Sequence, residues 1–168
     1  MNNRKVYISG EIVPEVDAKI SIFDSAVLLG DTVTESTRTF NFKPFKLDEH
    51  LERLYKSFKL TRIDPQMTIE EMKKVSLELL EINKDNYKAN EDCWLVHNIS
   101  RGHSITGGNP ALQVSKPTVM IYTQPMNLVL WAPFYTKGCH AVTPPTRMVP
   151  SQSLDARINN RSRLFYTL

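Results

Sequence analysis

Apolar and polar positions alternate in short stretches of the first 123 residues, and between these stretches the apolar positions recur at helical spacing. The alternation predicts a hairpin over residues 5–14 and further strands over 18–24, 32–40, 93–100 and 118–123. A stripe of apolar side chains predicts a helix over residues 47–60. A second helix is expected to begin after Thr68, because Thr68 and Glu71 have the spacing of a capping box.

This order of elements predicts an α+β fold for residues 1–123, with a mixed or mostly antiparallel sheet and helices packed on it. Residues 124–137 include two prolines and lack a sustained period, which is typical of an interdomain linker. Residues 138–168 begin with a strand-like stretch and are interpreted as the first part of a second, β-rich domain. They are too few to form a hydrophobic core by themselves, so we expect this second domain to be incomplete.

The composition is ordinary for a globular protein, with 41% hydrophobic and 23% charged residues. A net charge of +3, from 21 basic and 18 acidic residues, gives no strong field for polyanions. Cys93 and Cys139 lack the spacing of a metal site, and no apolar run approaches the roughly 20 residues that cross a bilayer. Since the N-terminus has no signal-peptide pattern, we expect a cytoplasmic protein without a metal, a membrane span or a nucleic-acid partner.

The most informative feature is an ordered set of short motifs, because the common nucleotide, zinc and serine-hydrolase motifs are missing. The set comprises Gly10-Glu11, Ala18, Ser21, Asp24, Gly30-Asp31, Glu35, Arg38, Phe45, Leu47, His50, Arg53, Leu54 and Ser57, followed by Ser100-Arg101-Gly102 and PSQSLDARINNRSRL near the C-terminus. In order and spacing these motifs resemble those of the class IV, or fold type IV, pyridoxal-phosphate aminotransferases. That family includes branched-chain and D-amino-acid aminotransferases and aminodeoxychorismate lyase.

The resemblance implies roles for several residues. Arg53 occupies the position of the arginine that binds the phosphate of pyridoxal 5′-phosphate, although pairing with Glu49 one helical turn away is the alternative. On the predicted strand 32–40, three side chains fall where relatives line the substrate pocket; these are Thr34, Ser36 and Arg38. A salt bridge from Arg38 to Glu35 or Glu11 is the alternative for that cation. His97 and Arg101 are further pocket candidates, and for Arg101 a structural role is equally expected.

The segment that resembles the catalytic one departs from the family at its decisive position. Relatives have a lysine there, whose amine forms a Schiff base with the cofactor and then moves the proton. This chain has Asn159, and a carboxamide is neither basic nor nucleophilic. The chain also spans only about the first half of a typical member, and its last residues, FYTL, read as the start of a helix. We therefore expect no appreciable transaminase activity from the chain as written.

Three alternatives remain open from the sequence. The chain could be a non-catalytic pseudo-transaminase that serves in binding or dimerisation. It could resemble the pyruvate-eliminating lyase of the same family, since both reactions use the same scaffold and lysine. The arginines near the C-terminus could also form a tail for phosphate or nucleic acid. The resemblance itself implies pyridoxal phosphate as cofactor, an amino donor and a 2-oxo acid as substrates, and a homodimer.

Overall fold

The structure, a computed structural model, describes residues 3–88, 91–103 and 116–162. Its elements are β1 (Lys5–Ile8), β2 (Glu11–Pro14), a 3-10 turn (Glu15–Asp17), α1 (Ser25–Leu29), β3 (Thr32–Phe40), β4 (Lys43–Pro44), α2 (Leu47–Thr61), α3 (Ile69–Asn83), a second 3-10 turn (Lys84–Asn86), β5 (Cys93–Ser100), β6 (Thr118–Pro125) and α4 (Leu128–Lys137). The predicted hairpin, the strands at 32–40, 93–100 and 118–123, and both long helices are confirmed. The FYTL segment lies outside the described residues.

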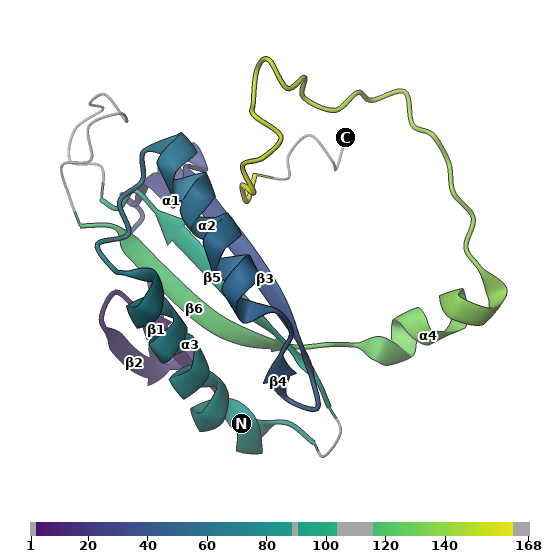
Figure 1. Cartoon of the computed structure of the whole chain (residues 1–168), viewed down its shortest axis with the longest axis horizontal. Coiled ribbons are helices and arrows are strands. Elements are labelled where there is room, and N and C mark those ends of the chain that lie inside the picture. The colour runs from purple at the N-terminus through teal and green to yellow at the C-terminus, as the bar shows by residue number, and fades with distance from the viewer. Residues whose placement is uncertain (1–2, 89–90, 104–115, 163–168) are drawn as a thin grey trace.

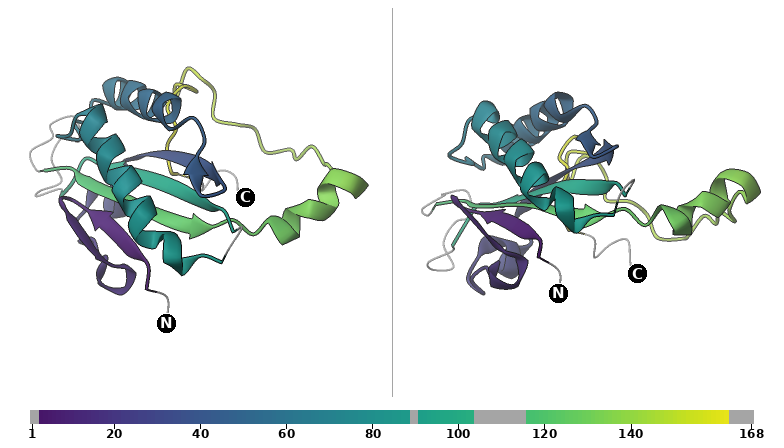
Figure 2. Two further views of the ribbon diagram at one scale, coloured as in Figure 1. Left: turned by 60° about the horizontal axis from the view of Figure 1, so that its bottom comes forward. Right: turned by 90° about the horizontal axis from the view of Figure 1, so that it is seen from below.

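The strands form one antiparallel sheet in the order β2-β1-β6-β5-β3-β4. Helices α2 and α3 lie side by side across one face of it (Figures 1 and 2). The sheet with its helices agrees with the predicted α+β fold. On β3 the register against β5 pairs Glu35 with His97 and Thr34 with Asn98, which fixes the face on which each side chain lies.

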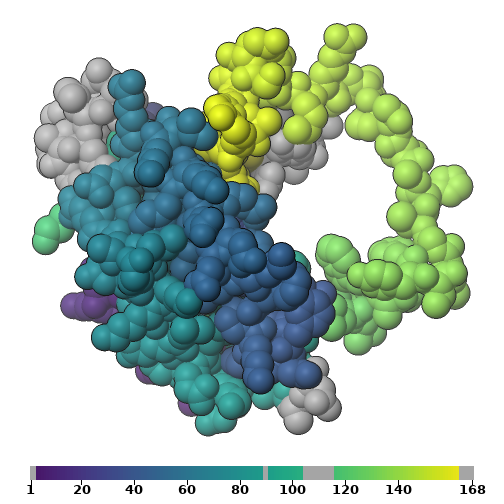
Figure 3. Space-filling view, viewed as in Figure 1, coloured from purple at the N-terminus to yellow at the C-terminus, as the bar shows by residue number. Residues whose placement is uncertain are grey.

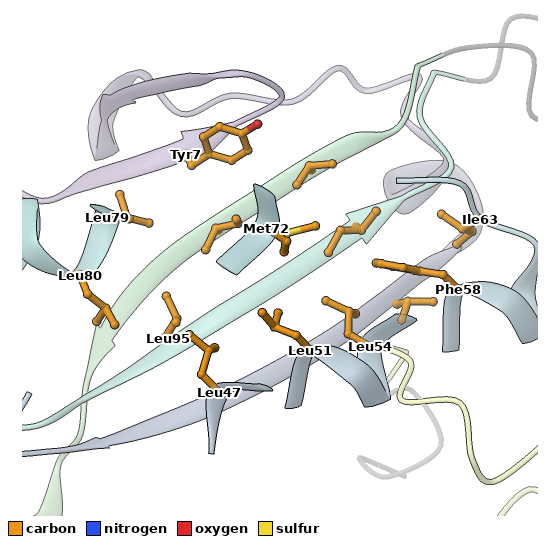
Figure 4. Packing of buried hydrophobic residues seen from close by; sticks show 14 of the residues in the cluster. Tyr7, Leu47, Leu51, Leu54, Phe58, Ile63, Met72, Leu79, Leu80 and Leu95 are labelled. Atoms are coloured by element: carbon orange, nitrogen blue, oxygen red, sulfur yellow. The ribbon is translucent and has the colours of Figure 1, made fainter. Parts of the chain in front are cut away.

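The core lies between the sheet and the two helices (Figure 4). Its members are almost fully buried; they include Leu51 and Leu54 of α2, Met72 and Leu79 of α3, and Leu95, Ile99 and Ile121 of the sheet. Each large aliphatic side chain buried in this way stabilises the fold by about 1.5–3 kcal/mol. The capping box predicted at the start of α3 is present, with Thr68 accepting from the Glu71 amide and the Glu71 carboxylate accepting from the Thr68 amide.

The strand predicted over residues 18–24 is wrong. The segment is irregular and ends in a turn, and Ile22 is 70% exposed, so its alternation of apolar and polar residues meets no neighbouring strand. Asp24 instead caps α1 by accepting a hydrogen bond from the Ala26 amide, and its other carboxylate oxygen accepts from Thr118 on β6. Local capping chemistry therefore outweighs the apolar period here.

The segment beyond β6 also differs from expectation. A ten-residue helix, α4, lies within the range predicted as a linker, and none of its side chains is buried. The strand-like pattern that begins at residue 138 predicted a strand, but residues 138–149 are not paired with any strand in the described part of the chain. The interpretation of 124–137 as a linker and of 138–168 as the start of a second domain stays a prediction. None of the helices described is long and apolar enough to cross a membrane.

The chain beyond α4 returns to the sheet. Figure 1 shows α4 standing away from the sheet and the last described residues lying beside β3. Asn160 forms an antiparallel bridge with Val33, the Thr34 amide donates to the Asn159 carbonyl at 2.8 Å, and the Arg161 amide donates to the Thr32 carbonyl at 3.3 Å. Residues 159–161 therefore cover the edge of β3 that β4 leaves open.

Candidate cofactor site

A buried carboxylate, Glu35, organises the candidate site. Its side chain is 1% exposed and lies on the face of β3 that packs against α2. Arg53 donates to it from Nε and Nη2, at 2.7 and 2.6 Å, and the Nδ1 atom of His50 lies 3.0 Å from one of its oxygens. The backbone amide of Ser36 adds a hydrogen bond at 3.0 Å. His50 and Arg53 are one turn apart on α2, so both reach the same carboxylate.

The electrostatics of this cluster are set by two opposing effects. Burial raises the pKa of Glu35, but the hydrogen bonds from Arg53, His50 and the Ser36 amide outweigh burial and hold the pKa below its usual value. The same hydrogen bond raises the pKa of Arg53. Glu35 is therefore an anion whose charge is balanced by the guanidinium that it holds.

Arg53 can bind a second anion while it keeps Glu35. A guanidinium carries five N–H groups in a planar fork, and Glu35 uses the edge formed by Nε and Nη2. The side chain is 55% exposed, and among the described residues Nη1 has no protein partner. The remaining edge of the fork matches a phosphate group. The predicted pairing of Arg53 with Glu49 is not formed. Arg53 pairs with Glu35 instead, and the described ion pair of Glu49 is with Lys46.

The backbone of Asn159 is hydrogen-bonded to Thr34, the residue that precedes Glu35 on β3. As the cross-strand neighbour of Thr34 it shares the sheet face of Thr34, Ser36 and Arg38, opposite to the helices. Thr34 and Glu35 are consecutive, so Asn159 and Arg53 approach β3 within one residue of each other, from its two faces. In Figure 3 the yellow C-terminal residues lie against the blue surface that includes α2. The structure thus places the two positions that sequence motifs assigned to the cofactor beside consecutive residues of β3, on opposite faces of the strand, although more than a hundred residues separate them.

Arg38 does not bind either carboxylate that the sequence suggested. Glu35 lies on the opposite face of β3, and the Arg38 guanidinium stacks 3.8 Å from the centre of the Phe40 ring while its Nε donates to the Thr39 carbonyl at 3.3 Å. Together with Trp94 and residues of α4, Arg38 lines a hollow of about 200 Å³ at the far end of β3. Arg38 is therefore separated along the strand from Asn159.

His97 and Arg101 do not join the candidate site's open face. His97 is fully buried beneath the helices, with Nε2 2.8 Å from the hydroxyl of Ser76, and burial lowers its pKa to about 4. Arg101 donates to Asp31 at 2.7 Å and to the carbonyls of Thr61 and Arg62 at the end of α2. Of the two expectations for Arg101, the structural one is supported.

The roles of Glu35 and His50 were missed from the sequence, although both belong to the matched motifs. One signal was available. The period of β3 places Glu35 on the same face as the apolar Val33, which indicates that the carboxylate is buried. A buried carboxylate without a partner on its own strand needs a cation from a helix packed on that face. Among the described residues no group of three or more His, Cys, Asp or Glu side chains is arranged to hold a metal ion.

Comparisons with known proteins identify the family. A family model described as Amino-transferase class IV matches residues 32–168. The chain belongs to the class IV aminotransferase family. It is 35% identical over 160 residues to a putative branched-chain-amino-acid aminotransferase of Methanocaldococcus jannaschii, which covers 95% of the chain and 52% of that protein. It is 32% identical over 120 residues to D-alanine aminotransferases of Staphylococcus epidermidis, which covers 71% of the chain and 41% of those proteins.

Solved structures show the same fold for this family member. A branched-chain amino acid aminotransferase from the organism abbreviated T.th., in complex with N-(5′-phosphopyridoxyl)-L-glutamate, superposes with a TM-score of 0.78 at 22% identity over 94% of the chain and 50% of that structure. The enzyme of Thermoproteus uzoniensis with norvaline gives 0.74 at 24% identity, covering 94% of the chain and 51% of that structure. The chain thus spans about half the length of the relatives that it matches.

The residues present fit part of the family's cofactor. The outward edge of Arg53, held from below by Glu35, suits the phosphate of pyridoxal 5′-phosphate. The covalent attachment does not fit, because the residue opposite Thr34 is Asn159 and a carboxamide forms no Schiff base.

Proposed function

We propose that this aminotransferase-family chain binds the phosphate of pyridoxal 5′-phosphate through Arg53 and does not itself catalyse amino transfer. The observation that supports phosphate binding is the bidentate contact of Arg53 with the buried Glu35, which fixes the guanidinium and leaves its other edge toward solvent. The same contact lets His50 brace the carboxylate from the next turn of α2. When bound, the cofactor supplies the electron-withdrawing ring that amino transfer requires.

The lack of catalysis follows from Asn159. Removal of the proton from the substrate carbon needs a base at this position, and an amide has no proton affinity in the working pH range. In relatives with the lysine, the substrates we assign to this face are an amino donor and a 2-oxo acid. Thr34 and Ser36 supply its polar lining beside Asn159, and Arg38 lies further along the same face of β3. We also assign the protein to the cytoplasm and expect it to act as a homodimer.

The phosphate contact is tested by equilibrium titration with pyridoxal 5′-phosphate and with pyridoxal. The phosphorylated form should bind, and Arg53→Met should weaken it at least about tenfold, because a charge-assisted bidentate contact is lost. Lys56→Met is the matched control, since Lys56 is an exposed cation on the next turn of α2 whose only described ion pair is to Glu52 at 3.9 Å. Equal binding of both compounds, or equal losses in both variants, would argue against the assignment.

The catalytic half of the proposal is tested by following amino transfer from a panel of L- and D-amino acids to 2-oxo acids. We expect no product above the protein-free control. Turnover that scales with protein concentration would contradict the assignment of Asn159. Release of pyruvate without amino transfer would instead favour the lyase of the same family.

A non-catalytic role in dimerisation is favoured by one observation. Several large apolar side chains lie on the surface of α4, among them Val129 at 81%, Trp131 at 60% and Tyr135 at 84% exposure. Exposed apolar groups in such number are typical of interaction surfaces. Sedimentation of the chain and of Trp131→Ser should distinguish a dimer held through α4 from a monomer.

A further inference from the structure

A cavity of about 390 Å³ lies on the face of the sheet opposite to helices α2 and α3. Tyr7 and Ile121 are buried against the helices, so the residues that alternate with them on β1 and β6 point the other way. In the right-hand view of Figure 2 the helices lie on one side of the sheet, and the segment that follows β2 lies on the other. The strands and this segment together supply an apolar lining of Val6, Ile8, Ala18, Ile20, Met120 and Tyr122.

The cavity lies where β1 and β6 separate. The two strands pair at Tyr7 and Ile8. Two residues before Tyr7, the backbone of Lys5 is bonded to a side chain instead. The Lys5 amide donates to Oδ1 of the buried Asn83 at 2.7 Å, and Nδ2 of Asn83 donates to the Lys5 carbonyl at 2.9 Å. Asn83 thus takes the place of a neighbouring strand, and Lys5 is held at the cavity with its backbone polar groups satisfied.

A network of polar contacts holds the segment after β2 against β1. Arg4 donates from Nε and Nη2 to the Glu15 carboxylate at 2.9 and 2.8 Å, and the Glu15 amide donates to the Arg4 carbonyl at 2.9 Å. Beyond Glu15, Ala18 and Ile20 line the cavity, while Lys19 between them is exposed. The start of the apolar alternation over residues 18–24, which forms no strand, therefore matches the wall of this cavity.

The lining combines an apolar body with a surplus of positive charge. Its charged residues are Arg4, Lys5 and Glu15. Arg4 and Glu15 neutralise each other, and Lys5 has no ion pair among the described residues. The volume is in the range of small-molecule sites, in which apolar walls bind a ligand and a few polar groups orient it. An anionic end group would gain a charge-assisted hydrogen bond from the ammonium of Lys5.

We propose that this cavity binds a small amphipathic monocarboxylate, with its hydrocarbon part between the sheet and residues 18–20 and its carboxylate at Lys5. The site is separate from the phosphate site of the proposed function, because Arg53 meets Glu35 on the face that the helices cover. The proposal therefore does not depend on the assignment of Arg53. A ligand in the cavity contacts β1, β6 and the segment after β2 at once, so its binding stabilises the folded chain.

Isothermal titration of the whole chain with octanoate, hexanoate and octanol tests the ligand class. Octanoate should bind about tenfold more tightly than hexanoate, because two further methylene groups leave water. Octanol keeps the hydrocarbon chain without the charge and should bind about fivefold more weakly than octanoate. A lack of saturable octanoate binding, or equal binding of octanol, overturns the proposal.

Two pairs of variants locate the site. Ala18→Phe places a ring in the cavity and should weaken octanoate binding at least about tenfold, whereas Ala156→Phe adds the same ring at an exposed position and should not. Lys5→Met should weaken octanoate binding about fivefold and abolish the preference over octanol. Lys19→Met removes the same charge from an exposed neighbouring position and should change binding less than about twofold. Equal losses within either pair would overturn the assignment of the cavity.

Two further measurements keep the result independent of folding and of the phosphate site. Circular dichroism checks that each variant is folded, and if Ala18→Phe is not, the lysine pair and the comparison with octanol decide. Arg53→Met should bind octanoate as the wild type does, and pyridoxal 5′-phosphate should not displace octanoate. Competition between the two ligands would mean that octanoate binds at Arg53, which contradicts the proposal and leaves the phosphate site intact.

Discussion

At the scale of single residues, the candidate site depends on a carboxylate that is placed where water cannot reach it. Glu35 faces the core side of β3, and an unpaired charge at that place would cost several kcal/mol. Two residues of α2 remove this cost, and in doing so they acquire a fixed geometry. The stability of the fold and the orientation of Arg53 are therefore linked through one side chain.

Glu35→Gln tests that link, because it keeps the shape of the side chain and removes the charge. We expect the free energy of unfolding to fall by about 1–3 kcal/mol, as a charge-assisted pair becomes a neutral hydrogen bond. Affinity for phosphorylated ligands should fall with it, since Arg53 is held less firmly. Urea unfolding measures the first effect. Glu49→Gln, which removes a surface ion pair at 3.6 Å, should change stability by less than about 0.5 kcal/mol.

His97 makes stability depend on pH. In the folded protein burial lowers its pKa to about 4, from 6.5 for an exposed histidine. The unfolded chain therefore takes up the proton first, and stability is lost as pH falls from about 6.5 toward 4, by about 3 kcal/mol in all. Below about pH 4 His97 adds no further loss. Glu35, whose pKa is lowered in the folded protein, adds a further loss of stability as pH falls from the usual pKa of 4.5 toward that lowered value, because the unfolded chain takes up the proton first.

The measurement is urea unfolding at several pH values between 7 and 4.5. His97→Leu should remove most of the slope, whatever its effect at pH 7. His140→Leu, which replaces an exposed histidine on the irregular segment after α4, should leave the slope unchanged. Parallel profiles for the wild type and His97→Leu would show that another group titrates.

The face on which a residue lies could be predicted from the sequence, and its partner could not. The period of β3 separates Glu35 from Thr34, Ser36 and Arg38 correctly. The choice between Glu49 and Glu35 as the partner of Arg53 depends on how α2 crosses the sheet, which no local pattern records. His97 was placed in a pocket for the same reason, because strand periodicity does not show which face the helices cover.

At the scale of elements, the motif around α1 shows how one short helix is bounded. Asp24 caps its start, and Gly30 ends it in the left-handed conformation at φ +65°. The next residue, Asp31, pairs with Arg101 and so joins β5 to the loop before β3. The apolar alternation of residues 18–24 suggested a strand because it reports only side-chain hydrophobicity, whereas the backbone follows the cap at Asp24.

Gly30→Ala should destabilise the protein by about 1 kcal/mol, since a β-carbon disfavours the left-handed conformation. No neighbouring atom lies within 4 Å of the added carbon, so the cost comes from the backbone alone. Gly30→Asn should recover part of the loss, because asparagine adopts this conformation more readily. Thermal unfolding of the three proteins would measure the order. Equal melting temperatures for glycine and alanine would contradict the argument.

At the scale of the whole molecule, the site exists because two distant parts of the chain meet at one strand. The resemblance assigned Arg53 and Asn159 to one cofactor, yet local patterns indicated a linker and a new strand between them. In the structure that intervening chain forms α4 and an irregular segment, and only residues 159–161 return to the edge of β3. The return is a long-range contact of few residues, so hydrophobic periodicity could not predict it.

Arg161→Pro tests whether this return holds Asn159 in place. Proline has no amide to donate to the Thr32 carbonyl, and the extended backbone that it favours at residue 160 is already present. The sheet should survive, because β3 remains paired with β5 along its length. The Thr34 amide, which donates to the Asn159 carbonyl, should exchange its proton about tenfold faster, since a weakened edge opens more often.

Arg147→Pro, in the exposed irregular segment, is the control and should leave that exchange rate unchanged. Unchanged exchange in Arg161→Pro would mean that the hydrogen bond from the Arg161 amide to the Thr32 carbonyl does not hold this segment against β3.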